Sequence, residues 1–184
     1  MGVFLGIELP DSVRSELARV SLDSLVSPLH PQAIEQYHVT LIHFGTVSDA
    51  EMRRLVESVS HVTRDHCAFR LGIGDPGHFQ DGRYVWWGVI GQMDALRGLW
   101  TGLMDSTATI GTSIRVQPGD VVPQFRPHIT VASADDSALE PADTMVAKLR
   151  NCPRPSFSVT ELTLFSAQSG QYTALERFAL SGGP

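Results

Sequence analysis

A pattern of strand, turn and helix occurs twice in this sequence and constrains its fold more than any other feature. The first copy, YHVTLIHFG, covers residues 37–45, and the second, FRPHITVAS, covers residues 125–133. In each copy a His-x-Thr triplet lies in an apolar segment typical of a β-strand, and a turn rich in serine and aspartate precedes a short amphipathic helix. Two such copies indicate a pseudo-duplicated fold in which each half contributes one motif strand.

The other segments alternate between strand-like and helix-like periodicity, which predicts an α+β fold. Strands are expected over residues 3–9, 37–44, 68–73, 84–90, 125–132, 157–166 and 177–180, and helices from residue 11, from residue 49, over 94–108 and around 143–149. Asp49 stands where the N-cap of the second helix belongs, and the run from Gly74 to Gly77 indicates a turn between two strands. Without an evident linker, residues 1–184 should form a single domain.

Alternation along a strand places the two polar residues of each triplet on one face. His38 and Thr40 therefore point the same way, as do His128 and Thr130, whereas His43 has the opposite parity and should face away. If the two halves pack about a pseudo-two-fold axis, both pairs converge on one cleft. Because histidine can remove and donate protons near neutral pH, these four residues are our catalytic candidates.

Other histidine patterns are interpreted as structural. His61 belongs to a third His-x-Thr triplet that ends a helical stripe, where a histidine favours the helix dipole. No HExxH pattern is present, and no carboxylate stands three or four positions after His38 or His128, so we expect no metal and no cofactor.

The two motifs resemble the paired His-x-Thr signature of the two-histidine (2H) phosphoesterase superfamily, specifically its RNA 2',3'-cyclic phosphodiesterase and 2'-5' RNA ligase-like (LigT-like) branch. FLGIELPDSVRSEL, RYVWWGVI and LTLFSAQSGQYTALERFAL resemble further segments of that branch, in order. The resemblance implies a bilobal α+β fold, with two pseudo-symmetric antiparallel sheets and flanking helices around a central cleft. It also implies a metal-independent hydrolase of cyclic or 2'-5' nucleotide phosphodiesters, with His38, Thr40, His128 and Thr130 at its centre.

One position departs from the branch, whose members often carry a basic residue shortly after the second motif. This sequence has Ser133 there. Arg126, which shares strand parity with His128, and Arg83 are therefore the candidates that would meet the phosphate charge.

Aromatic side chains near the motifs are candidates for stacking a nucleobase. Tyr37 and Phe125 flank the two histidines in the sequence. Trp86 and Trp87 face opposite sides of their strand, so only one of them can reach the cleft while the other packs in the core. Alternation does not decide which one, and Trp87 is our substrate-binding candidate.

The net charge of -6 argues against binding to a long nucleic-acid tract, because such proteins usually cluster lysine and arginine. A nucleotide, an RNA 3'-end or a small cyclic nucleotide remains compatible as the substrate. No run of about 18 apolar residues suggests a membrane span, and Cys67 and Cys152 have no CxxC spacing. We expect a cytoplasmic monomer, and the alternative to an enzyme is a non-catalytic module that binds a nucleotide or RNA end.

Overall fold

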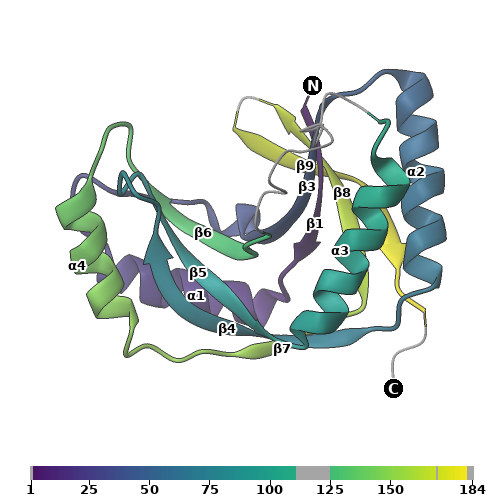
Figure 1. Ribbon diagram of the computed structural model, residues 1–184. Coiled ribbons are helices and arrows are strands. Elements are labelled where there is room, and N and C mark those ends of the chain that lie inside the picture. Colours follow the sequence, from purple (N-terminus) through teal and green to yellow (C-terminus); the bar gives the residue numbers. More distant parts are fainter. Residues whose placement is uncertain (1, 111–124, 169, 182–184) are drawn as a thin grey trace.

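The computed structural model describes residues 2–110, 125–168 and 170–181, which form two antiparallel sheets with helices beside them (Figure 1). The elements in chain order are β1 (Gly2–Glu8), α1 (Asp11–Ser24), β2 (His30–Pro31), the short 3-10 helix η1 (Ile34–Gln36), β3 (His38–Thr46), α2 (Asp49–Arg64), β4 (Phe69–His78), β5 (Tyr84–Gly91), α3 (Met93–Thr107), β6 (His128–Ser133), α4 (Leu139–Leu149), β7 (Ser156–Val159), β8 (Glu161–Gln168) and β9 (Gln171–Ala179).

The two sheets place their motif strands in similar positions. The first sheet runs β3-β1-β8-β9, and the second runs β2-β6-β5-β4-β7. In each sheet the motif strand pairs antiparallel with one strand on its inner side, β3 with β1 and β6 with β5. The two-sheet α+β architecture expected from the sequence is confirmed.

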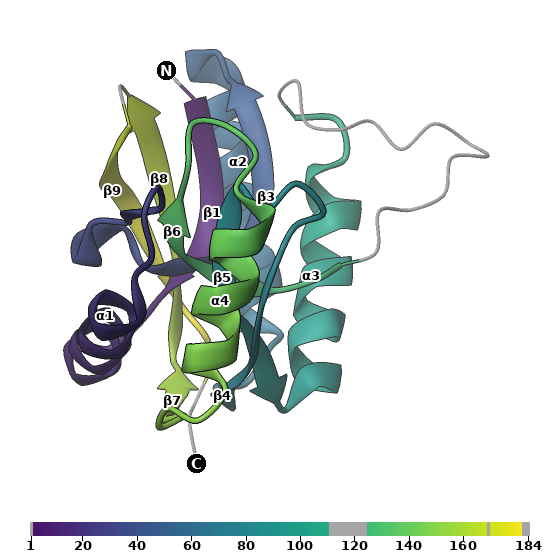
Figure 2. The same cartoon turned by 90° about the vertical axis from the view of Figure 1, so that its left-hand side faces the viewer.

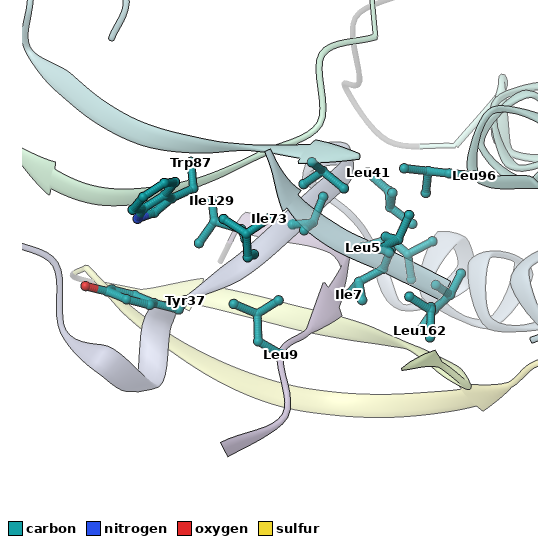
Figure 3. Close-up of a cluster of buried hydrophobic side chains, with 14 of the residues drawn as sticks. Leu5, Ile7, Leu9, Tyr37, Leu41, Ile73, Trp87, Leu96, Ile129 and Leu162 are labelled. Atoms are coloured by element: carbon teal, nitrogen blue, oxygen red, sulfur yellow. The ribbon is translucent and has the colours of Figure 1, made fainter. Parts of the chain in front are cut away.

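The core is a single cluster to which both sheets contribute. Strand alternation sends Leu5 and Ile7 of β1 into it from the first sheet, while Ile73, Trp87 and Ile129 enter from the second (Figure 3). Each of these side chains is buried, and a fully buried apolar side chain is worth about 1.5–3 kcal/mol. The shared cluster fixes how the two motif strands lie relative to each other.

The helices divide between the two sheets. Helices α2 and α3 pack against each other, and α2 also contacts β9 of the first sheet. Helix α4 packs on β4 and β5, and α1 contacts both α4 and β6 of the second sheet. Figure 2 shows the β4–β5 pair lying between α4 and α3. Within the described part of the chain, no helix is both long and apolar enough to span a bilayer.

The N-cap of α2 is Ser48, so the expectation of Asp49 was wrong by one residue. The Ser48 hydroxyl accepts a hydrogen bond from the Glu51 amide (3.3 Å), and the Glu51 carboxylate accepts one from the Ser48 amide (2.8 Å). This reciprocal capping box satisfies two backbone donors, which Asp49 inside the first turn could not do.

The run from Gly74 to Gly77 is not a turn but part of β4. Pro76 pairs with Trp87 and Gly77 with Trp86, with a register shift between Ile73 and Pro76. Proline is tolerated there because β7 pairs with β4 only as far as Gly72, and no other strand of the described residues lies beside Pro76 on that side.

Two further boundaries differ from the sequence expectation. Residues 157–166 form two strands, because the chain leaves the second sheet after β7 and enters the first sheet with β8. Helix α4 begins at Leu139, before Asp143, since Pro141 falls in the first turn, where no intrahelical partner for its missing N–H is needed.

Candidate functional site

His38 begins β3 with both ring nitrogens engaged. Its Nδ1 lies 2.6 Å from the carbonyl oxygen of Gln36, and its Nε2 lies 2.9 Å from Thr40 Oγ1. A carbonyl oxygen only accepts, so Nδ1 carries the proton and Nε2 keeps a lone pair that accepts from the Thr40 hydroxyl. The Gln36 contact therefore fixes both the tautomer and the orientation of the ring.

His128 begins β6 with an equivalent anchor. Its Nδ1 lies 2.8 Å from the carbonyl oxygen of Arg126, again two residues earlier in the chain. Nδ1 is thus the donor, and no described residue forms a hydrogen bond with Nε2. Thr130 lies two positions further along the strand, half-buried like His128. The two motifs therefore each present one Nε2 atom and one hydroxyl.

The two motif strands belong to different sheets and contact each other. β3 is an edge strand of the first sheet, and only the two-residue β2 lies outside β6 in the second. β3 and β6 pack together near the centre of the molecule (Figure 1). The charge of His128 also lowers the pKa of His38, so the two imidazoles lie close enough to interact.

Burial is the main cause that lowers the pKa of His38, to about 4. The neighbouring His43 and His128 act in the same direction, and the contact with the Gln36 carbonyl opposes them. His38 is therefore uncharged at neutral pH, and its Nε2 is available to take a proton.

Aromatic rings surround each histidine. Phe4, Phe165 and Tyr172 lie around His38, with ring centroids 4.8, 5.8 and 5.2 Å from the imidazole. On the other sheet, the centroids of Phe79 and Trp86 lie 5.3 and 5.9 Å from that of His128. These rings limit the orientations of each imidazole and exclude water from one side of it.

Comparison with known proteins places this arrangement in a family. The family model described as the 2'-5' RNA ligase superfamily matches residues 9–171. The chain belongs to this superfamily. The resemblance drawn from the two His-x-Thr motifs is thereby confirmed.

Two curated relatives are named RNA 2',3'-cyclic phosphodiesterase. The protein from Geobacillus stearothermophilus is 26% identical over 192 residues, which cover 98% of this chain. The protein from Methanothermobacter thermautotrophicus is 32% identical over 94 residues, or 47% of this chain. The matched regions span 58% and 50% of the length of these two relatives.

Solved structures of E. coli LigT share the whole fold with this superfamily member. The complex with 3'-AMP has a TM-score of 0.75 at 27% identity, and the apo form has a TM-score of 0.74 at 26% identity. Each match covers 98% of both chains. Usb1 from Kluyveromyces marxianus, at 14% identity and a TM-score of 0.58, is similar in fold alone, with 97% of both chains covered.

Two of the expected substrate-binding residues lie in the core instead. Trp87 is 0% exposed and Tyr37 is 2% exposed, and both belong to the apolar cluster shared by the two sheets (Figure 3). Neither ring can stack on a ligand from there, so these two expectations were wrong. Trp86, the other member of the tryptophan pair, is the one whose ring lies beside His128.

The remaining substrate-binding candidates differ in their surroundings. The Arg126 guanidinium lies 4.6 Å from the centroid of the Trp86 ring, in a cation–π contact next to His128. Phe125 is half-buried and stacks on Trp100, with centroids 4.7 Å apart. The exposed Arg83 side chain donates a hydrogen bond to the Asp135 carbonyl.

His43 lies on the same face as His38, contrary to the parity argument. The pairing of β3 with β1 skips Leu41, because Thr40 pairs with Gly6 and Ile42 pairs with Leu5. This β-bulge reverses the alternation beyond Leu41, and the exposed His43 ring comes within 5.4 Å of the Phe4 ring, centroid to centroid.

No three side chains from histidine, cysteine, aspartate and glutamate gather to hold a metal ion among the described residues. That the reaction needs no metal stays a prediction from the sequence.

Proposed function

We propose that this protein is a metal-independent phosphodiesterase that opens cyclic or 2'-5' nucleotide phosphodiesters, with 2',3'-cyclic phosphate ends as the principal substrate. The observation that carries the proposal is the equivalent anchoring of two imidazoles on contacting strands. In each, the Nδ1–H group donates a hydrogen bond to the backbone carbonyl two residues earlier. That anchoring leaves two Nε2 atoms for one reaction, as acid and base catalysis of hydrolysis requires. The names of the two curated relatives support the same substrate.

The lowered pKa of His38 supports a division of roles. As the uncharged ring, His38 takes a proton from water at Nε2 while the water oxygen bonds to phosphorus. The bond from phosphorus to one ribose oxygen breaks, and His128 in its protonated form gives that oxygen the proton on Nε2. The product is a phosphate monoester with a free ribose hydroxyl, and proton exchange with solvent returns both rings to their starting states.

The non-bridging phosphate oxygens need hydrogen-bond donors. Thr40 and Thr130 supply one hydroxyl each on the same faces as the histidines. Because Ser133 stands where the branch often has a basic residue, we assign the compensating charge to Arg126, whose guanidinium lies over Trp86 beside His128. Thr40 releases its contact with His38 Nε2 when the phosphate arrives.

The test is turnover by EDTA-treated protein of a panel of 2',3'-cyclic mononucleotides, 2'-5' dinucleotides and cyclic oligonucleotides, read by chromatography. His38→Ala and His128→Ala should each lower kcat by about 100 to 10,000-fold. His61→Ala, which changes the exposed histidine of the His-x-Thr copy on α2, is the matched control and should keep wild-type activity.

Two outcomes would contradict the proposal. If either motif variant retained more than about a tenth of the activity, acid and base catalysis by that residue would be excluded. Tight nucleotide binding with no product after long incubation would instead identify a non-catalytic binding module.

We further propose that residues 1–184 act as one domain, as a monomer in the cytoplasm. The core cluster shared by the two sheets supports one folding unit, and the unpaired cysteines Cys67 and Cys152 suit a reducing compartment. Light scattering after gel filtration would reveal a dimer if the proposed state were wrong.

A further inference from the structure

A pocket adjoins His128 without including either motif histidine. It encloses about 520 Å³, and its lining includes Trp86 and Arg126. Since the Trp86 ring lies 5.9 Å from the His128 ring, one aromatic side chain separates the pocket from the proposed acid. A ligand bound between the two histidines could therefore extend into it.

Three arginines line this pocket, on three separate parts of the chain. Arg97 comes from α3, Arg126 from the segment before β6, and Arg150 from the C-cap of α4. Helices α3 and α4 lie on opposite sides of the β4–β5 pair (Figure 2). The fold thus gathers these cations from distant positions in a chain whose net charge is -6.

Each of the two carboxylates that line the pocket already has a basic partner. Asp75 forms an ion pair with Arg154 at 2.7 Å, and Asp143 Oδ1 lies 2.9 Å from His78 Nε2. His78 Nδ1 lies 2.7 Å from the Phe79 carbonyl oxygen, so both ring nitrogens face acceptors; the Phe79 contact, and after it the Asp143 contact, raise the pKa of His78 above its ordinary value.

The arginines are left with little compensation. Arg97 lies 3.6 Å from Asp94, but both side chains are exposed, and exposed pairs of this kind contribute little. No described carboxylate forms an ion pair with Arg126 or Arg150. The pocket is therefore locally positive, and it suits an anion with several oxygen acceptors.

We propose that this pocket binds the 5'-phosphate of the nucleotide whose cyclic phosphate lies between the histidines. In an RNA strand that group is the linkage to the preceding nucleotide, so the substrate class is an RNA 3'-end rather than a free cyclic mononucleotide. This inference rests on the proposed phosphodiesterase function. The 5'-phosphate is the group that distinguishes an RNA 3'-end from a free cyclic mononucleotide.

The test compares three substrates: a nucleoside 2',3'-cyclic phosphate, the same compound with a 5'-phosphate, and a trinucleotide that ends in a 2',3'-cyclic phosphate. Wild type should show a higher kcat/KM for the second and third. Arg97→Ala/Arg150→Ala should lower the ratio of trinucleotide to mononucleotide kcat/KM by about tenfold or more, since hydrogen bonds to charged groups have that magnitude. The slope of log kcat/KM against log salt for the trinucleotide should also become shallower by about 1.

Arg53→Ala/Arg64→Ala is the matched control, because both residues are exposed on α2 and the change in charge is the same. It should leave the ratio as in wild type. An equal fall in kcat/KM for all three substrates in the pocket variant would overturn the inference, as would a preference for the trinucleotide that the 5'-phosphate alone does not reproduce.

A binding measurement separates this inference from the proposed function. Fluorescence anisotropy with a labelled trinucleotide 3'-phosphate needs no turnover, and the pocket variant should bind it about tenfold more weakly than the control variant. Weaker binding without turnover of any substrate by wild type would reject the enzyme and keep the pocket. Turnover with equal binding by both variants would reject the pocket and keep the enzyme.

Discussion

The indole Nε1 of Trp100 donates a hydrogen bond to the carbonyl oxygen of Leu41, across 3.2 Å. Leu41 is the extra residue of the bulge that follows the first motif, so its carbonyl lies outside the regular pairing of β3 with β1. The same indole stacks on Phe125, three residues before His128. One side chain of α3 thus links the segments that carry the two histidines.

Trp100→Phe should destabilise the protein while keeping an aromatic ring for Phe125. The substitution leaves the Leu41 carbonyl without its donor, and an unsatisfied buried acceptor costs about 1–3 kcal/mol. Urea unfolding would measure the free energy of unfolding, and kcat should fall as well because the bulge is less firmly held. Tyr84→Phe, a similar loss of one polar group from an exposed ring, is the control. Equal stability of the two variants would show that the Trp100 contact contributes nothing.

Gly77→Ala should disturb the His128 side of the site. A Cβ atom at Gly77 would stand 2.5 Å from the Trp86 ring, which covers this glycine. The ring must move, and it lies against both His128 and Arg126. We expect a loss of about 1–3 kcal/mol in the free energy of unfolding and a lower kcat for cyclic phosphates.

Gly98→Ala provides the contrast for this substitution. A Cβ at Gly98 meets no atom within 4 Å, and alanine favours the α3 helix by about 1 kcal/mol over glycine. This variant should be at least as stable as wild type and equally active. If Gly77→Ala behaved in the same way, the proposed packing of Trp86 over Gly77 would be wrong.

Strand parity identified part of the site from the sequence and failed where a tertiary feature intervened. His38 and Thr40 precede the bulge, so the two-residue period places them correctly on one face. His43 follows the bulge, and no pattern in the sequence marks Leu41 as an unpaired residue. A single insertion reverses every later position of a strand, which is why the expectation for His43 was wrong.

Alternation also could not say which face of β5 meets the core. Trp86 and Trp87 had to point opposite ways, but which of the two rings enters the core depends on α1 and α4 packing against one face of the second sheet. Phe79 beside Tyr84 and Trp86 could have favoured Trp86, since aromatic residues at strand spacing gather on one face. The arginine pocket could not be predicted at all, because Arg97 and Arg150 line the same pocket only through the packing of separate helices.

His38 should make the protein less stable in acid. Its pKa is about 4 in the folded state and about 6.5 when unfolded, so the unfolded chain binds the extra proton first as pH falls. The contribution of His38 to the free energy of unfolding is therefore fully present above pH 6.5 and declines as pH falls from 6.5 to 4. Below that range up to about 3 kcal/mol has been lost.

Urea titrations of wild type and His38→Gln at pH 7.5 and pH 4 would isolate this contribution, because every other titrating group is common to both. The stability of wild type relative to His38→Gln should fall on acidification. An unchanged difference would mean that the pKa of His38 is the same in the folded and unfolded states.

His43→Ala should raise the pKa of His38, because the charge of His43 is one of the causes that lower it. Burial of the His38 ring persists in the variant, so its pKa should still lie below the ordinary value for histidine. NMR titration of the ring protons would follow His38 directly, and the acid limb of the kcat/KM profile should move to higher pH in parallel. His61→Ala, at an exposed position on α2, should move neither quantity. A His38 midpoint that did not respond to His43→Ala would show that His43 is electrostatically separate from the first motif, despite the bulge that brings both onto one face.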